Sequence, residues 1–139
     1  MAIDRGLTHV ALPVTDVDSS IEFYQRYAAM QVVHSRVDGE TGERVVWISD
    51  RTRPFVVVLI EQHPVQGGLT GFSHLGGCES RAEVDRQCAA ARTEGRSVVG
   101  PFDSGPPVGY WAMIRDPDGH NLELSYGQEV GLTVERARS

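Results

Sequence analysis

The chain has 139 residues, of which 40% are hydrophobic, and its formal net charge at pH 7 is −6. This length favours a single domain with one substantial core, and the composition excludes the disordered and fibrous classes. The acidic balance argues against a nucleic-acid surface. All 13 basic residues are arginine, which excludes Schiff-base chemistry and a lysine general base.

The hydrophobic pattern predicts four strands and one helix in the first half of the chain. The strands show alternating or short continuous apolar runs, and the helix shows apolar residues three and four positions apart. The expected strands are residues 8–14, 31–37, 44–49 and 55–62, with a helix at about 17–29. A connection with three glycines and one proline follows at 63–71.

The same order of elements recurs in the second half. The expected strands are residues 72–78, 97–99, 110–115 and 121–126, with a helix at about 81–93. The last two strands are joined by the Asp-Pro-Asp-Gly turn at 116–119. The loop at 100–109 is rich in glycine and proline, and it is either a lid beside a binding site or a plain connection.

Corresponding features of the two halves are 65 residues apart, as in a duplicated unit. His9 and His74 lie early in the first strand of each half. The patterns Thr15-x-x-Asp18 and Ser80-x-x-Glu83 resemble capping boxes at the starts of the two helices. The hairpins fall at nearly the same offset. Together these coincidences predict two tandem βαβββ modules.

The predicted fold class is therefore α+β, with the two modules forming a curled mixed β-sheet around a concave ligand cleft. In each module, one helix covers one face of a four-stranded sheet and leaves the other face to the cleft. The modules would cover about 6–62 and 72–127, within a single domain of residues 1–127. The polar tail at 128–139 would fray or pack on a partner.

Strand alternation places three residues of metal-binding types on the concave face. The more apolar row of the first strand should pack on the helix, which leaves His9 on the other face, and the same reasoning places His74 and Glu123 there. A single strand histidine is more often an ordinary core or surface residue, so the prediction depends on all three together. Two imidazoles and one carboxylate would bind a divalent metal and leave positions open for substrate.

Four segments of the chain resemble the glyoxalase/bleomycin-resistance/dioxygenase superfamily, also called the vicinal oxygen chelate fold. They are LTHVALPVTD at 7–16, IEFYQRYAAM at 21–30, FSHLGG at 72–77 and IRDPDGHNLEL at 114–124. The resemblance covers residues 6 to about 127. Its most specific part is the Asp-Pro-Asp-Gly turn followed by a strand glutamate.

The resemblance implies a homodimer and a divalent metal ion that chelates a small substrate through adjacent oxygens. The family's usual ligands correspond to His9, His74 and Glu123, which would meet within one chain or across the dimer. The metal would be Fe2+, Zn2+, Mn2+, Ni2+ or Co2+. Glu123 would also be a catalytic group, because a metal-bound carboxylate can move a proton.

One position departs from the pattern of the isomerising relatives. Val58 lies 65 residues before Glu123, where glyoxalase-like and epimerase-like relatives have a further Glu or Gln. Val58 cannot move a proton, and Glu61, the nearest acid, falls at the end of its strand. Three ligands without a fourth favour dioxygenase-like or lyase-like chemistry, and a glyoxalase-like isomerase depends on where Glu61 lies.

Other residues are expected to shape a substrate pocket. Tyr110 is a candidate proton donor, and Arg115 would either meet an anionic substrate group or be an ordinary surface residue. About half of the hairpin residues should face the cleft. The remaining candidates for substrate binding are Trp47, Val58, Phe102, Trp111 and Met113. The histidines expected to be peripheral or solvated are His34, His63 and His120.

The leading hypothesis is a metal-dependent enzyme that acts on a small oxygenated molecule. The alternative is a metal-free protein that sequesters a drug or metabolite, as bleomycin-resistance relatives do. The tryptophans and the acidic balance would suit a cationic aromatic ligand in that case. Neither a membrane nor a nucleic acid is an expected partner.

A cytoplasmic location is the expectation from the ends and the cysteines of the chain. Cys78 and Cys88 form no disulfide framework, which is typical of a reducing compartment. Asp4 and Arg5 interrupt the N-terminal residues, which do not resemble a signal peptide. The longest aliphatic run, at 56–60, is too short to span a bilayer.

Overall fold

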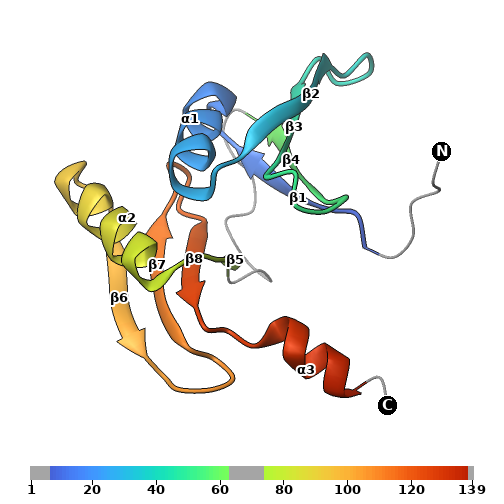
Figure 1. Ribbon diagram of the computed structural model, residues 1–139. Helices are drawn as coiled ribbons and strands as arrows, with labels where there is room; N and C mark the ends of the chain where they lie inside the picture. The colour runs from blue at the N-terminus through green and yellow to red at the C-terminus, as the bar shows by residue number, and fades with distance from the viewer. Residues whose placement is uncertain (1–6, 63–73, 138–139) are drawn as a thin grey trace. The chain divides into compact units, whose positions relative to one another are not determined.

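The computed structural model describes residues 7–62 and 74–137. The expected connection at 63–71 and His63 lie outside these residues. The described elements, in chain order, are β1 (His9–Val14), α1 (Val17–Ala28), β2 (Gln31–Val37), β3 (Arg44–Ser49), β4 (Val56–Glu61), β5 (His74–Cys78), α2 (Arg81–Thr93), β6 (Val98–Asp103), β7 (Tyr110–Arg115), β8 (Asn121–Tyr126) and α3 (Val130–Ala137) (Figure 1).

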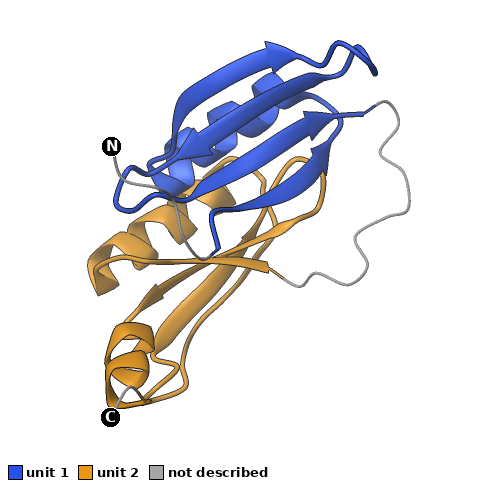
Figure 2. Cartoon of the chain, turned by 90° about the vertical axis from the view of Figure 1, so that its right-hand side faces the viewer, with its two compact units in different colours: residues 1–70 blue, residues 71–139 orange. Residues whose placement is uncertain are grey.

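The chain forms two compact units, residues 1–70 and 71–139 (Figure 2). Each unit contains one four-stranded mixed sheet, with the strand order β1-β4-β3-β2 in the first and β5-β8-β7-β6 in the second. The first and fourth strands of each unit are parallel, and the other neighbours are antiparallel. This order confirms the α+β class and the two tandem βαβββ modules. The concave cleft stays a prediction.

The strand registers show the repeat residue by residue. In the first unit Ala11 of β1 pairs with Val58 of β4, and in the second unit Gly76 of β5 pairs with Glu123 of β8. Both members of each pair are 65 positions from their counterparts. Val58 therefore occupies in the first sheet the position that Glu123 occupies in the second.

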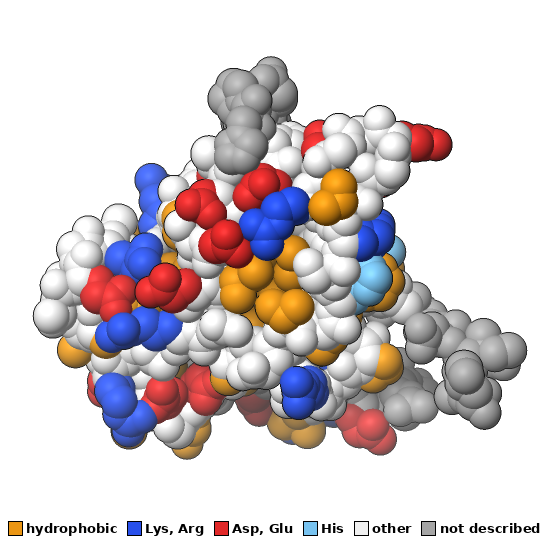
Figure 3. All heavy atoms as spheres, turned by 90° about the horizontal axis from the view of Figure 1, so that it is seen from above, with side chains coloured by type: hydrophobic (Ala, Val, Ile, Leu, Met, Phe, Trp, Pro, Cys, Tyr) orange, Lys and Arg blue, Asp and Glu red, His pale blue; other side chains and the backbone are white. Residues whose placement is uncertain are grey.

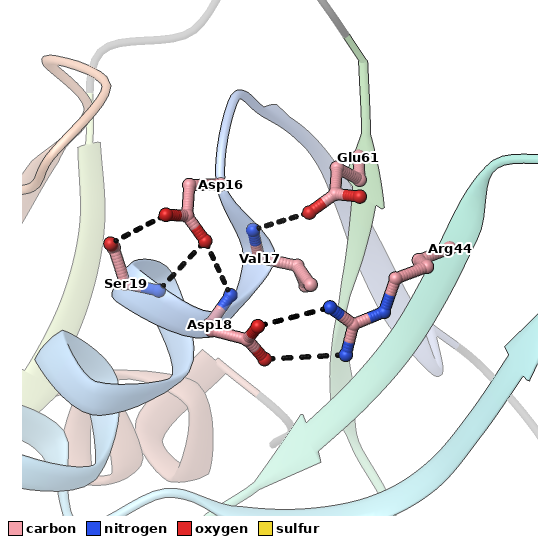
Figure 4. A network of polar contacts seen from close by, with 6 residues as sticks. All are labelled: Asp16, Val17, Asp18, Ser19, Arg44 and Glu61. Atoms are coloured by element: carbon pink, nitrogen blue, oxygen red, sulfur yellow. Dashed lines mark hydrogen bonds and ion pairs between the residues drawn. The ribbon is translucent and has the colours of Figure 1, made fainter.

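The N-terminal cap of helix α1 is Asp16, one residue later than the predicted cap Thr15. The Asp16 side chain accepts hydrogen bonds from the backbone amides of Asp18 and Ser19, at 3.0 and 3.3 Å (Figure 4). The capping box at Thr15 was therefore wrong, because the Asp16 carboxylate lies next to the first turn and satisfies its free amides.

Helix α2 begins as predicted. The Ser80 hydroxyl accepts a hydrogen bond from the Glu83 amide at 3.1 Å. The two helices start at Val17 and Arg81, so the repeat shifts by one residue between the first strands and the helices.

The apolar face of each sheet packs on the helix of its own unit, as strand alternation predicted. Fully burying a large apolar side chain contributes about 1.5–3 kcal/mol. The buried strand residues of the first unit include Leu12, Val14, Val46, Ile48, Val57 and Leu59. Those of the second include Ala112, Ile114, Leu122 and Leu124. The helix residues buried with them include Tyr24, Tyr27, Val84, Cys88 and Ala91.

Two elements differ from the sequence prediction. Strand β6 extends to Asp103, into the region expected to be a loop, and a register shift between Val99 and Phe102 explains why alternation did not reveal it. The C-terminal tail forms helix α3, because its apolar residues recur at helical spacing. Its residues are all exposed.

Acidic and basic side chains are mixed over the face shown in Figure 3. No helix within residues 7–62 and 74–137 has the length and apolar character that crossing a membrane requires.

Candidate metal and substrate site

The second unit brings two of the three predicted metal ligands together. His74 begins β5, and Glu123 lies in the middle of the parallel neighbour β8, with both side chains on the face opposite α2. The Nε2 atom of His74 lies 2.8 Å from the Oε2 atom of Glu123. Glu123 is only 6% exposed.

A glycine leaves space beside this pair. A Cβ atom added to Gly76 would have Glu123 Oε2 as its nearest neighbour, at 3.7 Å. Any larger side chain would extend over the carboxylate, because residue 76 points to the same face. The second unit therefore places a carboxylate oxygen next to an imidazole nitrogen, and residue 76 has no side chain to cover it.

The chemistry of the pair fits a divalent metal ion. Imidazole nitrogen and carboxylate oxygen are ordinary ligands of such ions. Two ligand atoms at neighbouring octahedral positions, each about 2.1 Å from the metal, are about 3 Å apart, so the observed separation allows both atoms to bind one ion. A buried carboxylate costs several kcal/mol unless it is paired, and a dication would offset that cost.

The pair is an incomplete ligand set. Within the described parts of the chain, no group of three or more His, Cys, Asp or Glu side chains is placed to hold a metal ion. His9, the third predicted ligand, begins β1 in the first unit and is exposed on the face opposite α1. Its Nδ1 atom lies 2.9 Å from the Thr8 hydroxyl, an arrangement in which Nε2 can bind a metal. Its convergence with His74 and Glu123 stays a prediction.

Glu61 lies on the face of the first sheet that α1 covers, and its side chain caps the N-terminus of this helix. The backbone amide of Val17, the first residue of α1, donates a hydrogen bond of 2.9 Å to Glu61 Oε2 (Figure 4). The carboxylate also lies at the positive end of the helix dipole. Val58, three residues earlier on the strand, points to the opposite face, so Glu61 does not replace the acid that Val58 lacks.

Tyr110, the candidate proton donor, lies on the face of the second sheet that α2 covers. Its hydroxyl donates a hydrogen bond to Asp85 of α2, and the Arg81 guanidinium lies 3.9 Å from the ring centroid. The hydrogen bond to Asp85 raises the pKa of Tyr110 above its ordinary value. Because Glu123 points to the opposite face, the structure does not bring these two residues together.

The other candidates on β7 share the face of Glu123. Met113 pairs with Glu123, and Trp111 and Arg115 lie two residues to either side. Phe102 is 52% exposed and its ring centroid lies 5.3 Å from that of Trp111. Trp111 donates a hydrogen bond from Nε1 to the Ser104 hydroxyl at 2.9 Å. An aromatic pair and an arginine therefore flank the His74–Glu123 pair.

The first unit carries a second aromatic cluster. Trp47 pairs with Val58 and so lies on the face of His9. The His34 and Trp47 ring centroids are 4.8 Å apart, and the Arg36 guanidinium lies 5.9 Å from the Trp47 ring. His34 lies on the exposed edge strand, in agreement with its expected peripheral position.

His120 differs from its predicted environment. It was expected to be solvated in a turn, but it is only 3% exposed. Its backbone amide donates a hydrogen bond of 2.8 Å to Oδ1 of Asp116, which is itself buried. Asp116 at the start of the Asp-Pro-Asp-Gly turn and His120 directly after it are therefore buried, while Pro117 is exposed.

Sequence reasoning missed Gln128, which it assigned to the tail. The Gln128 side-chain amide donates to Glu123 Oε1 at 3.4 Å. No sequence motif predicts this contact, because Gln128 lies beyond the alternating pattern of the last strand. Gln128 also lies in a groove of about 380 Å³ beside α3, lined in addition by Pro107, Val108, Glu129, Val130, Thr133 and Val134.

Two βαβββ modules and a strand imidazole–carboxylate pair define a protein of the vicinal oxygen chelate type. The chain belongs to the Glyoxalase/Bleomycin resistance protein/Dioxygenase superfamily, whose family model matches residues 6–124. This finding confirms the resemblance seen in the sequence.

Comparison with individual proteins gives the following similarities. The chain is 37% identical over 129 residues to Uncharacterized protein PA2024 of Pseudomonas aeruginosa, a match that covers 90% of this chain and 91% of that protein. It is 30% identical over 128 residues to Lactoylglutathione lyase GLX1 of Arabidopsis thaliana, which covers 87% of this chain but only 44% of the plant protein. The trypanothione-dependent glyoxalase I of Leishmania major has a TM-score of 0.76 at 22% identity, covering 96% and 95% of the two chains.

Proposed function

We propose that the protein is a divalent-metal-dependent enzyme that binds a small oxygenated substrate and carries out lyase-like chemistry. The observation that carries this proposal is the 2.8 Å approach of His74 Nε2 to Glu123 Oε2 on the sheet face opposite α2. Similarity to a lactoylglutathione lyase supports the reaction class.

His74 and Glu123 would hold the metal, with His9 as the third ligand from the same chain or from the partner in a homodimer. When bound, a divalent ion would act as a Lewis acid on two adjacent substrate oxygens. Nitrogen and oxygen ligands are compatible with Fe2+, Zn2+, Mn2+, Ni2+ or Co2+.

The side chains around the pair have distinct tasks in this proposal. Glu123 is the group that would accept a substrate proton, since the opposite position of the repeat is Val58. Arg115 would bind an anionic substrate group, and Phe102 and Trp111 would contact an apolar part. A single carboxylate favours lyase-like chemistry with one base over an isomerisation in which two acidic side chains move the substrate proton.

The alternative is a metal-free binding protein, and the exposed cluster around Trp47 favours it. The Arg36 guanidinium already lies beside the Trp47 ring, so a stacked ligand would meet a positive charge. This arrangement favours an anionic planar ligand rather than the cationic one suggested by the acidic composition. Calorimetry with planar anions in the presence of chelator separates the two functions, because the metalloenzyme should lose its ligand affinity there.

Metal analysis of protein purified without chelator tests the proposal. The wild type should carry stoichiometric metal, which His9→Ala, His74→Ala and Glu123→Ala should each remove. The matched control is Glu61→Gln, which alters a strand carboxylate on the helix face and should keep the metal. Substoichiometric metal in the wild type, or no loss in the Glu123→Ala variant, would overturn the proposal.

A further inference from the structure

The two oxygens of the Glu123 carboxylate have different partners within the second unit. Oε2 lies 2.8 Å from His74 Nε2, and Oε1 accepts a hydrogen bond from Gln128 Nε2 at 3.4 Å. A carboxylate at the end of a flexible side chain rotates readily about its last torsion. A partner on each oxygen defines the plane of the group.

The backbone on both sides of Gln128 is held in a turn that directs its side chain toward Glu123. Gly127 has a φ of 75°, which turns the chain immediately after β8. A Cβ atom at Gly109 would lie 2.9 Å from the Gly127 carbonyl oxygen, so only glycine allows this close approach. The Glu129 amide then donates a hydrogen bond of 2.9 Å to the Pro107 carbonyl. The β6–β7 loop thus holds the chain on both sides of Gln128.

We propose that Gln128 is a positioning residue that orients the Glu123 carboxylate so that Oε2 faces the ligand position beside His74. This inference rests on the proposed function. A neutral amide suits the task because it donates a hydrogen bond without adding a positive charge that would repel a cation. The distance of 3.4 Å is long for such a bond, so its removal should change the folding stability of the metal-free protein little.

Substitution of Gln128 tests the inference through metal affinity. Gln128→Met keeps the length of the side chain and removes its donor, and Gln128→Ala removes both. Loss of a hydrogen bond that orients a metal ligand weakens metal binding by about 10- to 100-fold. Both variants should show that loss in calorimetric titrations with Mn2+, while the thermal midpoint of the metal-free protein stays at the wild-type value.

The matched control is Gln87→Met on helix α2. Its amide donates a hydrogen bond of 3.0 Å to Glu83, so it has the same chemistry away from the site. This variant should keep the wild-type affinity for Mn2+. The visible absorption spectrum of bound Co2+ adds a readout of ligand geometry, which should change in both Gln128 variants and not in the control.

The outcomes separate the inference from the proposed function. Wild-type protein that binds neither Mn2+ nor Co2+ would overturn both. Wild-type binding, together with Gln128 variants that keep the same affinity and the same Co2+ spectrum, would overturn the role of Gln128 alone. A loss of affinity equal in Gln87→Met and Gln128→Met would also overturn it.

Discussion

The imidazole Nε2 of His74 and the carboxylate Oε2 of Glu123 approach to 2.8 Å across the parallel pair β5 and β8. The first unit repeats this strand pair but places Val58 where the second has Glu123. At this position of the repeat, only the second unit therefore has an acidic side chain. The proposed chemistry follows from this asymmetry, because the Glu123 carboxylate would both bind the metal ion and accept the substrate proton.

Glu61 is predicted to matter for stability and not for metal binding. Glu61→Ala removes the acceptor of the Val17 amide and a negative charge at the N-terminus of α1. The free energy of unfolding should fall by about 1 kcal/mol, as for other helix caps. Glu61→Gln keeps an acceptor and should lose less. Urea unfolding measures both, and a loss of bound metal in folded Glu61→Ala protein would contradict this assignment.

Tyr110 is predicted to give the second unit a pH-dependent stability. The hydrogen bond to Asp85 raises the pKa of Tyr110 in the folded state, so folding favours the neutral phenol. This stabilisation is fully present below the unfolded pKa of about 10 and is lost as the pH rises through the higher folded pKa. Wild type should be more stable than Tyr110→Phe at neutral pH, and the difference should disappear at high pH.

Urea unfolding of both proteins across this pH range measures the effect. Tyr126→Phe, on the neighbouring strand, is the control for loss of a phenol. A stability difference that grows above pH 10, or a Tyr110→Phe variant that loses metal, would contradict the placement of Tyr110 on the helix face.

The face of each strand could be predicted from the sequence because period-two alternation is a local property. It placed His9 opposite the apolar row of β1, and it placed His74 and Glu123 on one face of the second sheet. It also gave β2, β3, β7 and β8 with the bounds that the structure has, and the spacing of apolar residues three and four positions apart did the same for α2. These predictions required only the pattern of neighbouring residues.

Contacts that depend on the three-dimensional path of the chain could not be predicted in this way. The register shift between Val99 and Phe102 hid the end of β6, because it interrupts the alternation. The partners of Glu61, Tyr110 and Gln128 lie on other elements, at 44, 25 and 5 residues' distance along the chain. Even the nearest of these depends on a turn at Gly127 rather than on a regular period.

Gly76 is predicted to limit what fits beside Glu123. Its added Cβ would lie 3.7 Å from Glu123 Oε2, an ordinary contact, so Gly76→Ala should keep metal affinity. The branches of Gly76→Val would crowd the carboxylate and should weaken Mn2+ binding, because they displace Oε2 or cover it. Calorimetry gives the affinities.

Gly77→Val is the matched control for this prediction. A Cβ at Gly77 has no neighbour within 4 Å, and residue 77 points to the opposite face. It should keep the wild-type affinity. Equal affinity in all three variants would show that the space beside Glu123 is not the binding position.

The two cysteines are predicted to differ in reactivity. Cys78 is exposed and Cys88 is buried on α2. Burial raises the pKa of the Cys88 thiol, which further reduces its reactive thiolate. An alkylating reagent should modify Cys78 alone in native protein and both cysteines in urea, as peptide mass spectrometry would show. Rapid modification of Cys88 in the native protein would contradict the α2 packing.

A crystal structure of the protein with Mn2+ or Zn2+, measured at the metal's absorption edge, would locate the ion directly. We expect an anomalous peak at bonding distance, about 2.0–2.3 Å, from His74 Nε2 and a Glu123 oxygen, with His9 as a further ligand. A metal-saturated crystal in which the ion binds elsewhere and leaves His74 and Glu123 paired only with each other would contradict it.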